Sequence, residues 1–144
     1  MKTVRIIAAA FAALFATTAS AQIADGSVAP DFTATDINGN TVSLQEFMDA
    51  GKTVIMDVSA TWCPPCWSYH QSGILETFYE MFGPEGADVA TVIYVEGDAT
   101  TTLEDIQGTG SNTLGDWTAG VNYPIVDDAD IADDYEITYF PTIF

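Results

Sequence analysis

Two long apolar stretches of the chain have the length and composition of buried strands. Residues 53–58, Thr-Val-Ile-Met-Asp-Val, form an almost continuous apolar run, which predicts a central strand at Thr53–Ser59. Val89–Val95 is rich in β-branched residues and predicts a second strand. Between them, apolar residues recur near helical spacing, so we expect one helix from about Pro65 to Phe82. Its apolar positions are Cys66, Tyr69, Ile74, Leu75, Phe78, Tyr79 and Phe82.

A turn signal interrupts the alternating pattern nearer the N-terminus. Asn38-Gly39 lies between two short segments, Thr33–Thr35 and Thr41–Ser43. This dipeptide between alternating segments predicts a β-hairpin. The serine that ends the second segment can cap a short helix over Leu44–Ala50, and Gly51 can end that helix.

The C-terminal part of the chain is more polar and its predicted elements are shorter. They are a helix at Thr101–Gln107, a strand at Tyr123–Val126, a helical turn at Asp130–Tyr135 and a strand that begins at Phe140. Strands that alternate with helices predict an α/β fold, in which helices flank a mixed central sheet and the N-terminal hairpin is an extension. Because the sequence ends at Phe144, we expect the domain to be truncated at its C-terminal strand and helix.

The first residues have the pattern of a targeting segment. Lys2 and Arg5 precede an apolar stretch, Ile6–Ala16, and Ala19-Ser20-Ala21 has the small residues of a cleavage site. The apolar stretch is too short for a confident membrane span. We therefore expect residues 1–21 to be a bacterial signal peptide and residues 22–144 to be one domain. The domain would be exported, either periplasmic or secreted, with no membrane insertion after cleavage.

The charge of the predicted domain is strongly one-sided. All 21 acidic residues follow residue 21, and Lys52 is the one Lys or Arg in that part of the sequence. Such a negative field repels nucleic acid and anionic membrane surfaces, so we expect neither as a partner. Solubility or adaptation to salt accounts for this composition, and steering towards a basic partner is the alternative.

Both cysteines of the chain lie in one motif, residues 62–66, Trp-Cys-Pro-Pro-Cys. The motif follows the predicted central strand and opens the predicted helix, whose free N–H groups and partial positive charge favour a thiolate. The spacing lets Cys66 attack a mixed disulfide at Cys63 and so release the bound partner. These features favour a redox-active pair, with a static disulfide or metal ligation as alternatives. An exported compartment tolerates disulfides, so a redox partner would have to recycle the pair.

Several motifs together resemble the TlpA/redoxin branch of the thioredoxin-like superfamily. They are Ala29-Pro30-Asp31-Phe32, Asn38-Gly39, Leu44, Gly51-Lys52 and Ala60-Thr61-Trp62-Cys63-Pro64-Pro65-Cys66. The resemblance runs from about Asp25 to the chain end and implies a thioredoxin fold and thiol-disulfide exchange. It implies Cys63 as the nucleophile and Cys66 as the resolving cysteine. Trp67 departs from the family, because a basic or polar residue is common at that position.

The resemblance also implies roles for two residues outside the motif. Asp57 corresponds to a buried acid beneath the resolving cysteine, where burial would raise its pKa and let it shuttle the Cys66 proton. An acid that reaches solvent or a backbone N–H at the strand end is the alternative. Pro141 corresponds to a cis-proline that faces the cysteines and helps to hold a substrate strand.

Four further side chains are expected to shape substrate binding or thiol reactivity. Trp62 would form an apolar platform beside an exposed Cys63 sulfur, with ordinary packing as the alternative, and Phe140 would narrow the substrate groove. Pro64 and Pro65 lack N–H groups, so fewer donors reach the sulfur. The acidic field and the lack of a histidine between the cysteines also disfavour a thiolate. Together these features predict a reductant rather than a strong oxidant.

Other chemistries have weaker support in the sequence. His70 completes a Cys-x2-Cys-x3-His pattern that suits Cu(I) or Zn²⁺, but a fourth ligand is missing and an ordinary helix residue is favoured. The acidic residues between 127 and 136 lack the spacing and glycine of an EF-hand. A peroxidase would need a cation, usually arginine, and residues 22–144 contain no arginine. We therefore expect no metal and no cofactor.

The sequence thus predicts an exported thiol-disulfide oxidoreductase that uses the Cys63/Cys66 dithiol as a reductant or redox carrier. Its expected partners are protein disulfides or dithiols and a redox protein that recycles the pair. The alternatives are a non-catalytic redoxin-like binding module of a larger secreted protein and a copper-handling chaperone.

Overall fold

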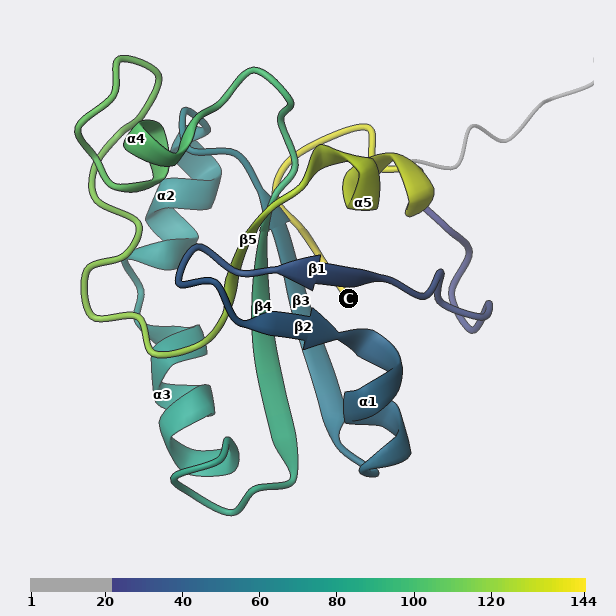
Figure 1. The fold of residues 1–144 in the computed structure, drawn as a ribbon. Helices are drawn as coiled ribbons and strands as arrows, with labels where there is room; N and C mark the ends of the chain where they lie inside the picture. Colours follow the sequence, from purple (N-terminus) through teal and green to yellow (C-terminus); the bar gives the residue numbers. More distant parts are fainter. Residues whose placement is uncertain (1–21) are drawn as a thin grey trace, which may run out of the picture.

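A four-stranded mixed sheet forms the centre of the molecule (Figure 1). The computed structural model describes residues 22–144, so the predicted signal peptide lies outside the described residues. The strands lie in the order β5-β4-β3-β6. Their bounds are Thr53–Ser59 for β3, Ala90–Glu96 for β4, Ile125–Asp127 for β5 and Thr142–Ile143 for β6. β6 runs antiparallel to β3 and the other pairs are parallel, which confirms the predicted mixed sheet.

The two central strands are covered on both faces. β3 and β4 pair along their whole length, from Thr53 opposite Ala90 to Ser59 opposite Glu96. Successive side chains point to opposite faces, so each strand contributes to two separate cores. One core contains Ala34, Val42, Met56, Val58, Ile93, Val95, Val126, Ile131, Ala132 and Tyr135. The other contains Ala60, Cys63, Cys66, Leu75, Val92, Tyr94, Ile106, Trp117, Tyr123 and Ile125.

The predicted N-terminal hairpin and the short helix after it are both present. The elements are β1 (Thr33–Thr35), β2 (Thr41–Ser43) and α1 (Leu44–Asp49). Asp36 closes the turn, since its Oδ1 accepts hydrogen bonds from the N–H groups of Asn38 at 2.9 Å and Asn40 at 2.8 Å. Ser43 caps α1, as predicted, by accepting a hydrogen bond from the Glu46 N–H at 3.3 Å.

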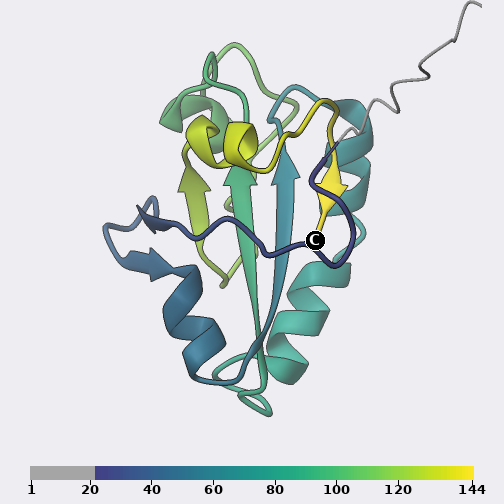
Figure 2. The same ribbon diagram turned by 90° about the vertical axis from the view of Figure 1, so that its right-hand side faces the viewer.

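The single helix expected from Pro65 to Phe82 is wrong, because the structure has two helices there, α2 (Pro64–His70) and α3 (Ile74–Phe82). Gly73 lies between them with a φ of 68°, a left-handed conformation that a right-handed helix does not contain. Both helices cover the same face of the sheet, while the hairpin, α1 and α5 (Ala129–Asp134) lie on the other (Figures 1 and 2). The apolar spacing therefore continued through the break, because both helices bury residues against one sheet face.

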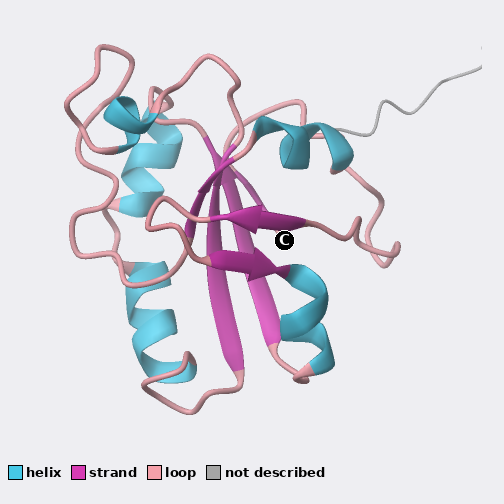
Figure 3. Ribbon diagram, viewed as in Figure 1, coloured by secondary structure: helices cyan, strands magenta, loops and turns pink. Residues whose placement is uncertain are grey.

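The C-terminal elements occur close to where they were predicted; the first helix and both strands are shorter than predicted, whereas the last helix keeps its six residues and begins one residue earlier. α4 (Leu103–Ile106) begins with a capping box between Thr102 and Asp105, and Asp128 caps α5. A long segment without strand structure joins α4 to β5 and lies beside α2 (Figures 1 and 3). Within the part of the chain that the structure describes, no helix is long and apolar enough to cross a membrane.

Candidate active site

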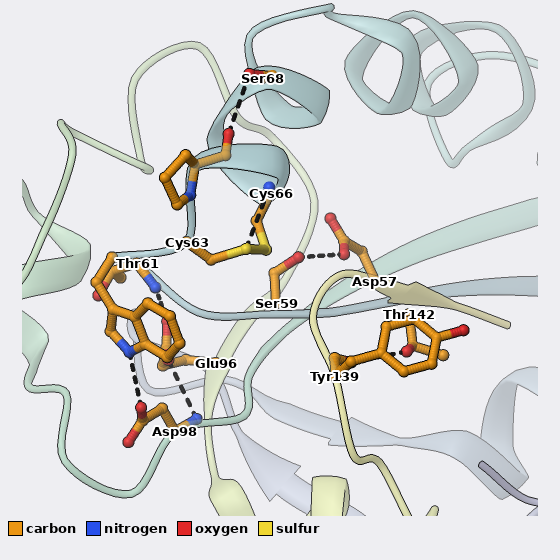
Figure 4. Close-up of a disulfide and its surroundings, with 12 residues drawn as sticks. Asp57, Ser59, Thr61, Cys63, Cys66, Ser68, Glu96, Asp98, Tyr139 and Thr142 are labelled. Atoms are coloured by element: carbon orange, nitrogen blue, oxygen red, sulfur yellow. Dashed lines mark hydrogen bonds between the residues drawn. A yellow bond between two sulfur atoms is a disulfide. The ribbon is translucent and has the colours of Figure 1, made fainter. Parts of the chain in front are cut away.

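The two cysteines form a disulfide where β3 leads into α2 (Figure 4). The S–S distance is 2.06 Å and the Cα atoms lie 5.3 Å apart. Cys63 is the N-cap of α2, and its Sγ accepts a hydrogen bond from the Cys66 N–H at 3.3 Å. Pro64 and Pro65 occupy the first two helical positions and have no N–H to offer. The Cys66 N–H is therefore the donor that the first turn supplies to this sulfur.

Both cysteines are buried, which corrects the expectation of an exposed Cys63 sulfur. Cys63 is 4 % exposed and Cys66 is 0 % exposed, so the resolving cysteine is the deeper one, as expected. The core that contains them is also contacted by the side chains of Trp67 and Phe140. The motif specifies where the cysteines lie on the helix, but the core that contains them also receives residue 140, far along the chain.

Asp57 is buried in β3 on the side of the sheet that carries the disulfide. It pairs with Tyr94, which belongs to the same core as the cysteines, and side chains of paired residues share a face. Asp57 is 1 % exposed, and its Oδ1 accepts a hydrogen bond from Ser59 Oγ at 2.6 Å (Figure 4). Burial raises the pKa of Asp57 to about 6, partly opposed by the Ser59 hydrogen bond and reinforced by the charge of Glu76. The alternative of an acid that reaches solvent is thereby excluded.

Predicted substrate-binding residues that lie far apart in the sequence come together near the disulfide. Trp62 is 41 % exposed and meets the ring of Phe140 edge-on, with centroids 6.3 Å apart. The Phe140–Pro141 peptide bond is cis. Thr142 pairs with Val58, so Pro141 lies beside the end of β3 that leads to the cysteines. The β3–β6 pairing therefore brings Pro141 close to the motif.

His70 is packed in an aromatic cluster. Its ring stacks on Trp67 with centroids 5.2 Å apart and lies 4.9 Å from the ring of Trp117. Burial lowers the pKa of His70, opposed by the charges of Glu76 and Asp116. Within the described residues, no group of three or more His, Cys, Asp or Glu side chains is arranged to hold a metal ion. His70 thus fills space between the aromatic rings.

Glu96 is a buried residue of this site that the sequence analysis missed. It ends β4 opposite Ser59 and is 0 % exposed. Its carboxylate accepts hydrogen bonds from the Thr61 N–H at 2.9 Å, the Tyr94 hydroxyl at 3.2 Å and the Asp98 N–H at 3.2 Å. Burial raises the pKa of Glu96 to about 7, although hydrogen bonding with the Thr101 side chain and the three hydrogen bonds above oppose the shift. The available signal was an acid directly after an apolar run, at the same edge of the sheet where the neighbouring strand β3 leads to the cysteines.

The mixed sheet, the disulfide at the start of α2 and the neighbouring cis-proline together define a thioredoxin-like protein. Solved structures share this fold. The thioredoxin domain of a thiol-disulfide oxidoreductase from Bacteroides vulgatus is 27% identical with a TM-score of 0.60, over 84% of this chain and 79% of that one. A putative protein disulfide isomerase from Bacteroides thetaiotaomicron is 26% identical with a TM-score of 0.61, over 80% and 66%.

Residues 24–139 match the Redoxin family, and the chain belongs to that family. A curated relative, thiol-disulfide oxidoreductase ResA of Bacillus subtilis (strain 168), is 29% identical over 124 residues. The match covers 85% of this chain and 61% of ResA, so the chain spans about three fifths of that relative's length. The thioredoxin-like, redoxin-type class predicted from the sequence is confirmed.

Proposed function

We propose that the chain is an exported thiol-disulfide oxidoreductase that reduces protein disulfides through Cys63 and Cys66. The observation that carries this proposal is the closed disulfide at the N-terminus of α2, on the same sheet face as the buried acid Asp57. The name of the ResA relative supports the same reaction class.

In the proposed reaction, the cysteine pair passes two electrons to the substrate. The Cys63 thiolate attacks one sulfur of the substrate disulfide, so a mixed disulfide forms and the other substrate sulfur leaves as a thiolate. Cys66 then loses its proton and attacks the Cys63 sulfur. This step forms the Cys63–Cys66 disulfide and releases the second substrate thiolate. A reducing dithiol partner returns the two electrons and reopens the disulfide.

Asp57 is the proposed acceptor of the Cys66 proton. With a pKa of about 6, most of its carboxyl is ionised at neutral pH, yet its basicity exceeds that of an ordinary aspartate. The Ser59 hydroxyl orients one carboxylate oxygen on the same sheet face as the disulfide. Because both cysteines are buried, a nearby buried base is a more direct acceptor than bulk water.

Two features favour reduction over oxidation. The Cys63 sulfur accepts a hydrogen bond from the Cys66 N–H, but the two prolines have no N–H to donate. The thiolate therefore gains little hydrogen-bond stabilisation. The sequence carries a formal charge of −18, which also disfavours another negative charge. A strong oxidant requires a stabilised reduced form, and both features work against one.

The proposed substrate is a disulfide in a protein segment rather than a small disulfide compound. Trp62 is partly exposed beside Phe140 and offers an apolar surface next to the disulfide. The proposed export rests on the basic, apolar and small-residue pattern of residues 1–21.

Reduction of insulin disulfides, with dithiothreitol as the electron source, tests the proposal. We expect wild-type protein to accelerate insulin reduction. Pre-reduced Cys66→Ala, freed of dithiothreitol and mixed with insulin, should accumulate a mixed disulfide at Cys63 that non-reducing electrophoresis resolves, and Cys63→Ala should neither react nor trap. A non-catalytic binding module would show no acceleration and no trapped intermediate, which would refute the proposal.

A further inference from the structure

A closed chain of hydrogen bonds joins the turn before Cys63 to the loop after β4 (Figure 4). Glu96 Oε2 accepts from the Thr61 N–H at 2.9 Å, and Glu96 Oε1 accepts from the Asp98 N–H at 3.2 Å. Asp98 Oδ2 in turn accepts from the indole Nε1–H of Trp62 at 2.7 Å. Since Thr61 and Trp62 are consecutive residues, these hydrogen bonds form a closed ring. One buried carboxylate therefore connects the two segments that orient this tryptophan.

Glu96 is poorly replaceable in this chain because its two oxygens serve different segments. Glu96 and Thr61 are both 0 % exposed, so no solvent is in contact to replace a lost acceptor. Leaving a buried N–H unpaired costs about 1–3 kcal/mol. Tyr94 adds a third donor from the same strand, at 3.2 Å.

Asp98 is also held in place apart from Glu96. Its Oδ1 accepts from the Thr100 N–H at 2.8 Å and from Thr100 Oγ1 at 2.7 Å. The oxygen that remains, Oδ2, accepts from Trp62. A partly exposed indole is thus bonded at its nitrogen and packed edge-on against Phe140.

We propose that Glu96 is a positioning residue, whose carboxylate fixes the turn before Cys63 and, through Asp98, holds Trp62 in the orientation that receives a protein substrate. The effect on turnover rests on the proposed function, whereas the effect on Trp62 does not. A protein segment must contact Trp62 and Phe140 to reach the disulfide, while a small disulfide needs less of that surface. Loss of Glu96 should therefore weaken the binding of protein substrates more than the reaction with small disulfides.

The test compares Glu96→Gln with Glu80→Gln, which makes the same chemical change at an exposed position of α3. Glutamine has one acceptor oxygen and a donor NH₂, so the Thr61 or the Asp98 N–H must face a donor. For Glu96→Gln, we expect the NMR signal of the Trp62 indole N–H, assigned from Trp62→Phe, to shift and to exchange faster. KM for insulin should rise about tenfold, the equivalent of one charged hydrogen bond, with kcat nearly unchanged. The rate with hydroxyethyl disulfide should stay within about twofold, and Glu80→Gln should match wild type in every measurement.

Asp98→Ala is the second variant, since it removes the indole acceptor while it leaves the Thr61–Glu96 bond in place. As in Glu96→Gln, the indole signal should shift and the KM for insulin should rise. This variant keeps the test available if Glu96→Gln does not fold. Unchanged indole signals, or equal losses for insulin and hydroxyethyl disulfide, would overturn the positioning role. Wild-type protein that reduces neither compound would contradict the proposed function instead. In that case a shifted indole signal in Glu96→Gln still supports the chain from Glu96 to Trp62, and an unshifted one overturns it.

Discussion

Two buried acids on adjacent strands have different surroundings at this site. Asp57 accepts one hydrogen bond from a side chain, Ser59 Oγ, which suits a group whose protonation changes during a reaction. Glu96 accepts from two backbone N–H groups of different segments and from the Tyr94 hydroxyl, which suits a group that holds those segments together. Burial raises the pKa of both, to about 6 and about 7. Burial alone therefore does not distinguish a proton acceptor from a positioning residue. The hydrogen-bond donors around each carboxylate make that distinction.

The proposed role of Asp57 predicts different effects for two substitutions. Asp57→Asn should slow the release of the mixed disulfide by about a hundredfold and remove the change in rate near pH 6, because the proton acceptor is lost. Ser59→Ala should keep this change in rate with pH but move its midpoint to a higher pH, by roughly half to one unit. The reason is that the hydrogen bond from Ser59 lowers the pKa of Asp57.

Single-turnover release of thiol from a mixed disulfide, measured across pH, gives both quantities. A rate and pH profile unchanged in Asp57→Asn would remove the acid from the mechanism.

At the scale of elements, the site depends on where α2 ends. The separation of α2 from α3 lets a short helix carry the cysteines while the longer one packs along the sheet (Figure 2). Gly73 provides the change of direction with its left-handed backbone. A Cβ at this position would have no atom within 4 Å, so the constraint is conformational rather than steric.

Gly73→Ala should therefore lower the free energy of unfolding by about 1–2 kcal/mol, the cost of a left-handed conformation for alanine. Gly73→Asn is the matched control and should lose less, because asparagine tolerates this region better. Urea denaturation of both variants measures the difference. A Gly73→Ala protein as stable as wild type would show that the helix break does not need this backbone conformation.

The whole molecule combines a strongly acidic composition with three carboxyls whose pKa values burial raises, those of Asp57, Glu96 and Asp127. Between the unfolded pKa of a carboxyl and its raised folded pKa, the folded protein holds a proton that the unfolded chain has released. Folding stability is thus fully supported below the unfolded pKa and declines as pH rises through the folded one. For Asp57 this window runs from 3.8 to about 6, and for Glu96 from 4.5 to about 7.

We therefore expect the free energy of unfolding to fall as pH rises from about 4 to about 7 and then to level off. Asp57→Asn should reduce the fall by at most roughly 3 kcal/mol, from a pKa shift of about two units. Urea denaturation at intervals across this range measures the slope. General repulsion between acids would respond equally to Glu80→Gln, so equal slopes for the two variants would contradict a specific contribution from Asp57.

The sequence by itself determined most of the elements, though not the break between α2 and α3, and it determined the location of the chemistry. Apolar runs, the Asn38-Gly39 turn and the Ser43 cap act over a few residues, so local patterns predicted β3, β4, the hairpin and α1. The CxxC spacing likewise placed both sulfurs in one motif between a strand and a helix. The family resemblance added the burial of Asp57 and the position of Pro141.

The tertiary structure decided the burial and the partners of these groups. Phe140 packs against the core that contains the cysteines, and Glu96 at the end of β4 reaches Thr61 after β3. Periodicity reports which face a residue occupies, but it does not report which donor another segment brings to that face. Such contacts depend on the pairing of β3 with β4 and β6, which no local pattern encodes.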